Sequence, residues 1–165
     1  MSDRTLTIEQ ALTPLAETSA RIAALASGLS PAQLRRRPNE WSANDVLAHL
    51  RACADVRGGY ILSMLAEDGL RLREMDPRSW MQKTDYPDLE FGDSFEAFAG
   101  QRADLLVVLQ RLPREGWSRP ATVIGAGKPL ETNVLFYADW LVVHERPHIK
   151  QIERIVKVTE EGATG

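Results

Sequence analysis

Apolar residues recur at helical spacing in four stretches of the chain. Within each stretch they stand three or four residues apart, which places them on one face of an α-helix. The four predicted helices run over about residues 7–29, 42–65, 93–112 and 132–156. No alternation of apolar and polar residues is long enough to predict a convincing strand. The pattern therefore predicts an all-α protein built as a four-helix bundle.

Two of the predicted helices begin at recognisable capping residues. Ser42 and Asp45 stand three residues apart, the spacing of a capping box, and Trp41 precedes them as an apolar staple. Thr7 and Gln10 repeat the spacing at the first helix. Such side chains bind the free backbone N–H groups of a first helical turn, so they fix where these helices start.

Two connectors are expected to lie between the long helices. Residues 67–92 hold scattered proline, glycine and aspartate without a sustained period, as in loops that cover a functional site. Residues 117–129 contain Gly125 and Gly127 and predict a loop or a small hairpin. Connectors of this length allow the two middle helices to run in the same direction. The pattern alone leaves the order of helix directions open.

Composition is typical of one globular domain. Of its 165 residues, 44% are hydrophobic and 26% are charged. A chain of this length and composition can bury a hydrophobic core. We expect a single domain over residues 1–160 and a short tail over 161–165. The net charge of −3, with both signs interspersed, argues against nucleic acid as a partner.

The sequence gives no indication of a membrane partner or of export. Residues 1–5 are polar and lack the apolar centre of a secretory signal. Apolar runs fall far short of the roughly 20 residues that span a bilayer. The single cysteine, Cys53, cannot form an internal disulfide, which suits a reducing cytoplasm. We therefore expect a cytoplasmic protein.

Candidate chemistry centres on the three histidines of the chain, His49, His144 and His148. His144 and His148 are four residues apart on the predicted inner face of the last helix, so their rings lie side by side. Burying two imidazoles without partners is costly, and a shared divalent metal removes that cost. His49 lies on the predicted inner face of the second helix and becomes the third ligand. Three nitrogen ligands with one open position are typical of catalytic zinc sites.

Other interpretations of these residues stay open. A single histidine on an apolar face is more often a hydrogen-bonded core residue than a ligand, and Cys53 is most simply a small buried hydrophobe. Residues 144–148 also match His-Glu-x-x-His, in which the glutamate of a metalloprotease activates water. Pro147 bends the backbone between the two histidines, and the strand expected upstream is missing, so this interpretation is disfavoured. A solvated side chain is then the simpler expectation for Glu145, and a role as acid/base or as a hydrogen-bond partner of a ligand stays open.

Residues Trp41 to Leu50, with the sequence Trp-Ser-Ala-Asn-Asp-Val-Leu-Ala-His-Leu, resemble the signature of the DinB-like superfamily. The segment from Leu29 to Leu34 and the last helix are similar to that superfamily as well, so the resemblance covers nearly the whole chain. It implies a four-helix bundle with up-down-down-up order, often dimeric, so a homodimer is one expected assembly. It also implies a three-histidine site for zinc, nickel or a related divalent ion, at His49, His144 and His148.

The resemblance implies a function as well. Members of the superfamily include S-transferases and isomerases that use mycothiol, bacillithiol or glutathione. We therefore expect a small-molecule substrate and a low-molecular-weight thiol cosubstrate, with the two connectors covering the site. Arg57 could meet a substrate carboxylate, although a surface arginine is the simpler interpretation. The alternatives are a non-catalytic, stress-associated bundle held together by metal, and a metal-free bundle that works as a dimer.

Overall fold

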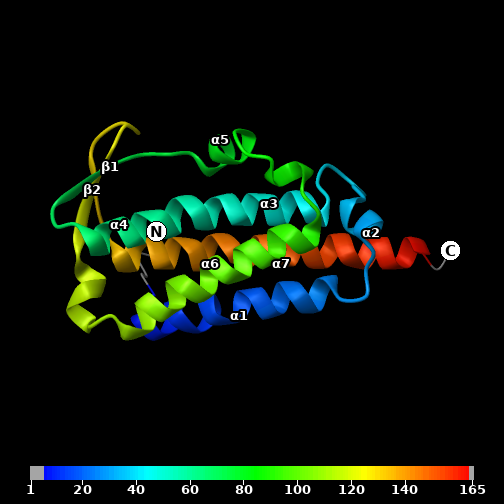
Figure 1. Cartoon of the computed structure of the whole chain (residues 1–165), viewed down its shortest axis with the longest axis horizontal. Helices are drawn as coiled ribbons and strands as arrows, with labels where there is room; N and C mark the ends of the chain where they lie inside the picture. Colours follow the sequence, from blue (N-terminus) through cyan, green and yellow to red (C-terminus); the bar gives the residue numbers. More distant parts are fainter. Residues whose placement is uncertain (1–5, 164–165) are drawn as a thin grey trace.

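The computed structural model describes residues 6–163 and is mostly helical (Figure 1). Four long helical segments form the bundle: α1 (Ile8–Ala26), α3 (Ala43–Cys53) with its continuation through η1 (Ala54–Gly58) and α4 (Gly59–Ala66), α6 (Phe91–Arg111), and α7 (Val134–Ala163). Short helices connect them: α2 (Pro31–Arg35), α5 (Pro77–Gln82), η2 (Tyr86–Asp88) and η3 (Arg114–Ser118). The predicted all-α, four-helix bundle is confirmed.

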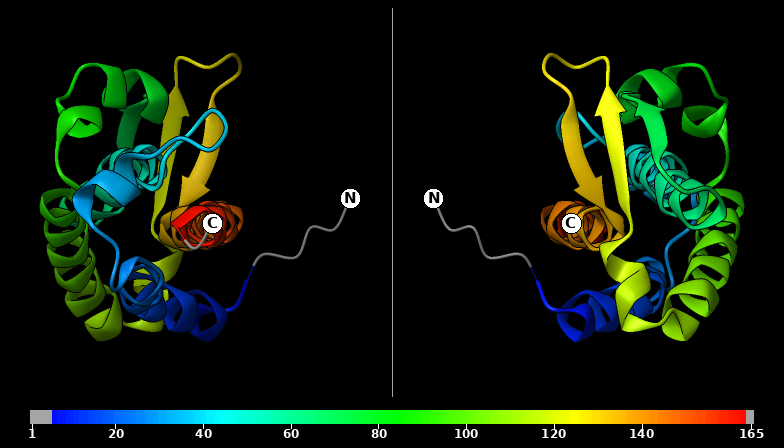
Figure 2. Two further views of the ribbon diagram at one scale, coloured as in Figure 1. Left: turned by 90° about the vertical axis from the view of Figure 1, so that its right-hand side faces the viewer. Right: turned by 90° about the vertical axis from the view of Figure 1, so that its left-hand side faces the viewer.

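The long helices follow an up-down-down-up order. α1 and α7 run in one direction, and α3, α4 and α6 run in the other (Figure 1). The connector after α4 travels back along α3, which allows α6 to start at the same end of the bundle as α3. Seen from its ends, each long helix packs against two others, with α1 next to α6 and α7, and α3 next to the same two helices (Figure 2).

A π-helical turn stands in the middle of the second long helix. η1 follows directly after Cys53, and α4 resumes at Gly59, so the helix continues through Gly58 and Gly59. A π-turn rotates the side chains that follow it about the helix axis, and such turns are frequent at functional sites. Here the turn begins one helical turn after His49.

A small three-stranded sheet lies at the end of the bundle near α4 (Figure 1). Its strands are β1 (Leu70–Arg73), β2 (Pro120–Ile124) and β3 (Leu130–Asn133), with β1 parallel to β2 and β2 antiparallel to β3. Of the two alternatives predicted here, a loop or a small hairpin, the structure has the hairpin, formed by β2 and β3, and Gly125 and Gly127 take positive φ at its turn. β1 was not predicted, because its four residues are too few for alternation to be distinctive.

The predicted helix ends agree with the structure to within a few residues, except at the last helix. The capping boxes of Thr7 with Gln10 and of Ser42 with Asp45 are both present. α6 starts at Phe91, two residues earlier than expected. α7 continues through its internal proline and past the expected end to residue 163, so it includes part of the expected tail. Residues 1–5 and 164–165, where the polar N-terminus and the rest of that tail fall, lie outside the described residues.

The buried faces are those expected from the helical spacing. His49 was expected on the inner face of the second helix, and it is buried together with the residues that share its face, Val46, Cys53, Val56 and Tyr60. On α7, His144 and His148 are half-buried, whereas Leu141 and Ile155 on the same face are buried. Within residues 6–163, no helix has the length and apolar character needed to cross a membrane.

Candidate metal centre

The three histidines meet between α3 and α7. The ring centroid of His49 lies 5.1 Å from that of His144 and 4.7 Å from that of His148, and the rings of His144 and His148 are 4.8 Å apart. The Nε2 atoms of His49 and His144 are separated by 3.0 Å. The structure thus brings together the three residues that the sequence predicted as ligands.

Cys53 lies in the same cluster. Its Sγ is 3.6 Å from Nε2 of His49, and the donor atoms of His49, Cys53 and His144 all lie within 4.8 Å of one another. Cys53 is buried, as expected of a small hydrophobe, but its sulfur also faces the histidines. The signal in the sequence was its position four residues after His49, which places both side chains on one helix face.

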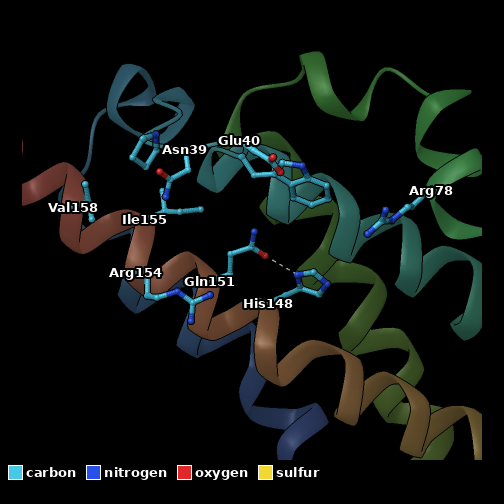
Figure 3. Close-up of a pocket in the computed structure, with 10 residues that line it drawn as sticks. Asn39, Glu40, Arg78, His148, Gln151, Arg154, Ile155 and Val158 are labelled. Carbon is cyan, nitrogen blue, oxygen red and sulfur yellow. Dashed lines mark hydrogen bonds between the residues drawn. The ribbon is translucent and has the colours of Figure 1, made fainter.

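His148 is oriented by a neighbour on its own helix. Its Nδ1 lies 2.9 Å from Oε1 of Gln151 (Figure 3). An amide oxygen accepts a hydrogen bond, so Nδ1 carries the proton and Nε2 keeps a free lone pair. Histidines that bind metals use this arrangement, with an acceptor holding the second ring nitrogen. The sequence alone did not indicate this role of Gln151.

Burial keeps His49 and His144 uncharged. It is the main cause that lowers the pKa of His49 to about 4 and that of His144 to about 4, with further contributions from the charges of His148 and Arg78. Both imidazoles are therefore neutral near pH 7, the form that binds metals. Burial also raises the pKa of the Cys53 thiol to about 12, and a bound cation would favour its thiolate.

The donor atoms of His49, His144 and Cys53 fit a divalent transition metal. A tetrahedral zinc ion at roughly 2.0–2.1 Å from nitrogen and 2.3 Å from sulfur separates two nitrogens by about 3.3 Å and a nitrogen from a sulfur by about 3.6 Å. The corresponding separations here are 3.0 Å between His49 and His144 and 3.6 Å between His49 and Cys53. Imidazole and thiol donors suit zinc or nickel, whereas calcium and magnesium prefer oxygen.

An aromatic stack holds His144 in place. Trp140, one turn earlier on α7, stacks on His144 with ring centroids 4.5 Å apart. The guanidinium of Arg57 lies 4.7 Å from the Trp140 ring and is bonded to Glu74 at 2.9 Å. Arg57 is only 7% exposed, so its interpretation as a surface arginine was wrong. Arg57 was also considered as a partner for a substrate carboxylate, but the carboxylate that it contacts is that of Glu74, which directly follows β1.

Glu145 faces away from the histidines. It is 2% exposed, so the expectation of a solvated glutamate was wrong. One of its oxygens accepts a hydrogen bond from Thr18 of α1 at 3.0 Å, and Arg102 of α6 bonds to both oxygens. Both carboxylate oxygens are thus engaged by α1 and α6 in the interior of the bundle. The metalloprotease interpretation of residues 144–148 is therefore disfavoured by the contacts of Glu145.

A cavity of about 900 Å³ opens beside the cluster, and His148 is the histidine that lines it. Its wall includes Trp41 ahead of α3, Arg78 of α5, and His148, Gln151 and Arg154 of α7 (Figure 3). The connector over residues 67–92 thus contributes to the cavity through α5, as expected of a covering segment. The hairpin turn was also expected to cover the site, but its residues do not line this cavity.

One carboxylate fastens the connector to the second helix. Asp55, in the π-turn, accepts hydrogen bonds from the Trp80 indole at 3.1 Å, the Tyr86 hydroxyl at 2.5 Å and the Gln101 amide at 2.7 Å. Trp80 belongs to α5 and Tyr86 to η2. These contacts hold α5, and with it Arg78, against the helix that carries His49.

Comparison with known proteins agrees with this architecture. A model of the DinB superfamily matches residues 15–152, and the chain belongs to that superfamily. Among solved structures, YfiT from Bacillus subtilis is similar over 97% of this chain and 93% of its own, with a TM-score of 0.75 and 17% sequence identity. YfiT is described as a probable metal-dependent hydrolase with an unusual four-helix bundle topology. None of the curated proteins compared matches the chain.

Proposed function

We propose that this protein is an enzyme that binds one divalent transition metal, zinc or nickel, through His49, His144 and His148. The observation that carries the proposal is the meeting of three imidazole rings from two helices beside a cavity. The proposal is also supported by the description of the structurally similar YfiT as a probable metal-dependent hydrolase.

We further propose that the cavity admits a low-molecular-weight thiol and that its sulfur attacks a small electrophilic substrate. A carbon–sulfur bond forms, the thiol gives up its proton, and the leaving group of the substrate departs with the bonding electron pair. A metal bound by neutral imidazoles keeps its charge, with which it can stabilise a thiolate or activate water. The residues of this chain prepare the site. Burial keeps His49 and His144 neutral, Trp140 holds the His144 ring, and Gln151 orients His148.

A non-catalytic metal site is the second candidate, and the position of Cys53 favours it. Three histidines and the Cys53 sulfur would form a closed set of four ligands, which is typical of structural zinc. The two candidates differ in the spectrum of the cobalt(II)-loaded protein. A closed set gives a thiolate-to-cobalt charge-transfer band that Cys53→Ser abolishes, and the chain has no second cysteine to supply one. An open three-histidine site gives no such band.

The first test is elemental analysis of untagged protein purified without chelator. We expect about one equivalent of a transition metal in the wild type and loss of that metal in the double variant His144→Ala, His148→Ala. Arg146→Ala, an exposed position between the two histidines, is the matched control and should retain the metal. Protein that lacks metal and also fails to take up added zinc or nickel would contradict both candidates.

Turnover separates the two candidates once the metal is known. Metal-loaded protein is incubated with thiols and a panel of electrophiles, and the loss of free thiol is followed. Turnover in the wild type that is absent from the double variant supports the enzyme. Full metal content with no turnover on any electrophile, together with a thiolate band, supports the structural site instead.

A further inference from the structure

Arg78 carries a charge that no neighbour in the structure neutralises. Among residues 6–162, no carboxylate forms an ion pair with its guanidinium, and Arg78 donates a hydrogen bond to Asp76 through its backbone N–H alone. Two other arginines near the metal centre are engaged. Arg57 pairs with Glu74, and Arg51 lies 3.7 Å from the centroid of the Tyr86 ring. Arg78 is therefore available to a ligand where Arg51 and Arg57 are not.

The position of Arg78 directs this charge toward the candidate metal centre. It belongs to α5, which packs on α3, and it lines the cavity together with His148 and Gln151 (Figure 3). Its charge contributes to the lowered pKa of both His49 and His144, so the guanidinium lies within electrostatic reach of the cluster. A ligand bound to Arg78 would thus extend along the cavity wall that contains His148.

The remaining lining of the cavity favours one negative charge. Arg78 and Arg154 supply two positive charges and Glu40 supplies one negative charge, which leaves an excess of one positive charge. Within residues 6–162, neither Arg154 nor Glu40 forms an ion pair. Trp41 adds a flat apolar face. A volume of about 900 Å³ is within the range of small-molecule sites.

We propose that the cavity binds a small carboxylic acid whose carboxylate pairs with Arg78 and whose other end reaches the metal centre. The planar guanidinium presents two N–H donors at the spacing of two carboxylate oxygens, which a lysine cannot do. The inference rests on the proposed function and adds the substrate class to it. Arg78 acts as a positioning residue, because it orients the acid and does not bind the metal.

The test compares matched thiols on the cobalt(II)-loaded protein. Mercaptoacetate, 3-mercaptopropionate and 4-mercaptobutyrate each carry a carboxylate, and the corresponding mercaptoalcohols do not. Binding of sulfur at cobalt changes the visible spectrum, which gives an apparent dissociation constant for each thiol. We expect at least one acid to bind about tenfold or more tightly than its alcohol, as a charge-assisted pair provides. In Arg78→Gln the acid should lose this advantage, while the affinity of the alcohol stays unchanged.

Control variants separate the role of Arg78 from a general effect of charge. Arg78→Lys keeps the charge without the paired donors and should retain part of the preference. Arg146→Gln removes an exposed arginine of α7 that does not line the cavity and should change neither affinity. Cobalt content is measured in every variant. The proposal is overturned if the wild type shows no preference for the acids, or if the Arg78→Gln variant keeps that preference. Normal cobalt content in these proteins would show that the metal site itself is intact.

Failure of the metal site gives a different result. If the wild type takes up no cobalt, the proposed function fails, and the carboxylate site is then tested by calorimetric titration of the metal-free protein with 3-mercaptopropionate. Binding that Arg78→Gln abolishes supports the site independently of the metal. Absence of binding in the wild type contradicts it.

Discussion

Gln151 contacts the candidate metal centre only through the ring of His148. Its amide oxygen accepts the Nδ1 proton and so fixes both the tautomer and the orientation of the imidazole. Without this acceptor the His148 ring is free to turn, and ordering it again opposes metal binding. The contribution of Gln151 to metal affinity is thus indirect and can be measured separately from that of the ligands.

We predict that Gln151→Ala weakens zinc or nickel binding by about 10–100-fold, the range observed when such supporting partners are removed. Gln151→Glu keeps an acceptor and should retain most of the affinity. Competition with a chromophoric chelator gives the affinities, and circular dichroism confirms that the helices are intact. Equal affinities in the wild type and in Gln151→Ala would mean that His148 is not a ligand in the orientation described.

Residue roles that depend on distant partners were beyond sequence analysis. The histidines were found because helical spacing places them on inner faces, and that spacing is a local property. Arg57 and Glu145 were misjudged because their counter-charges, Glu74 and Arg102, come from other parts of the chain. A buried charge is recognised only when its counter-charge is known, and a single sequence does not pair the two.

At the scale of elements, the contacts of Glu145 join three helices. It lies on α7, accepts a hydrogen bond from Thr18 of α1 and pairs with Arg102 of α6, whose guanidinium also donates to the backbone oxygen of Leu15 at 3.2 Å. Both charged side chains are almost fully buried. Such a pair adds little net stability compared with apolar residues, but removing one partner leaves the other charge buried and unpaired.

We predict that Glu145→Ala lowers the free energy of unfolding by about 3–5 kcal/mol. Replacing both partners, as Glu145→Leu with Arg102→Met, should recover most of that loss. The exposed pair of Arg114 with Glu9 provides the control, and Glu9→Ala should cost less than about 1 kcal/mol. Urea unfolding measures all three variants. A loss for Glu145→Ala no larger than that for Glu9→Ala would show that the buried pair is unimportant.

Elements defined by local signals were predicted well, and those defined by pairing were not. Ser42 with Asp45 marks the start of α3 because a cap depends on neighbouring residues alone. β1 was missed because it exists through its pairing with β2, about 50 residues later in the chain. The π-turn was missed as well, since its residues differ little in composition from those of an ordinary helix. Both missed elements shape the surroundings of the candidate site.

At the scale of the whole molecule, the histidine cluster makes the stability of the metal-free protein depend on pH. The pKa values of His49 and His144 are about 4 in the folded protein and near 6.5 when exposed. The unfolded chain therefore takes up protons first as the pH falls. The stabilisation due to these neutral rings is fully present above about pH 6.5 and is lost progressively toward pH 4. Asp45 has a pKa below its usual value of 3.8, so its loss of charge affects stability only at lower pH.

We predict that the metal-free protein, measured in chelator, loses stability steadily between pH 7 and pH 4.5. His49→Phe removes one of the two groups, so its stability should fall less steeply over the same interval, whatever its stability at pH 7. A bound metal requires the same neutral rings, so the stabilisation that it provides should also decline as the pH falls. At pH 7, a metal present at 100 times its dissociation constant adds about 2.7 kcal/mol to the free energy of unfolding. Urea unfolding midpoints at several pH values, with chelator or with zinc, test both effects. A midpoint independent of pH in chelator would mean that the histidines are not buried as neutral groups, and a zinc effect that persists at pH 4.5 would place the metal on other ligands.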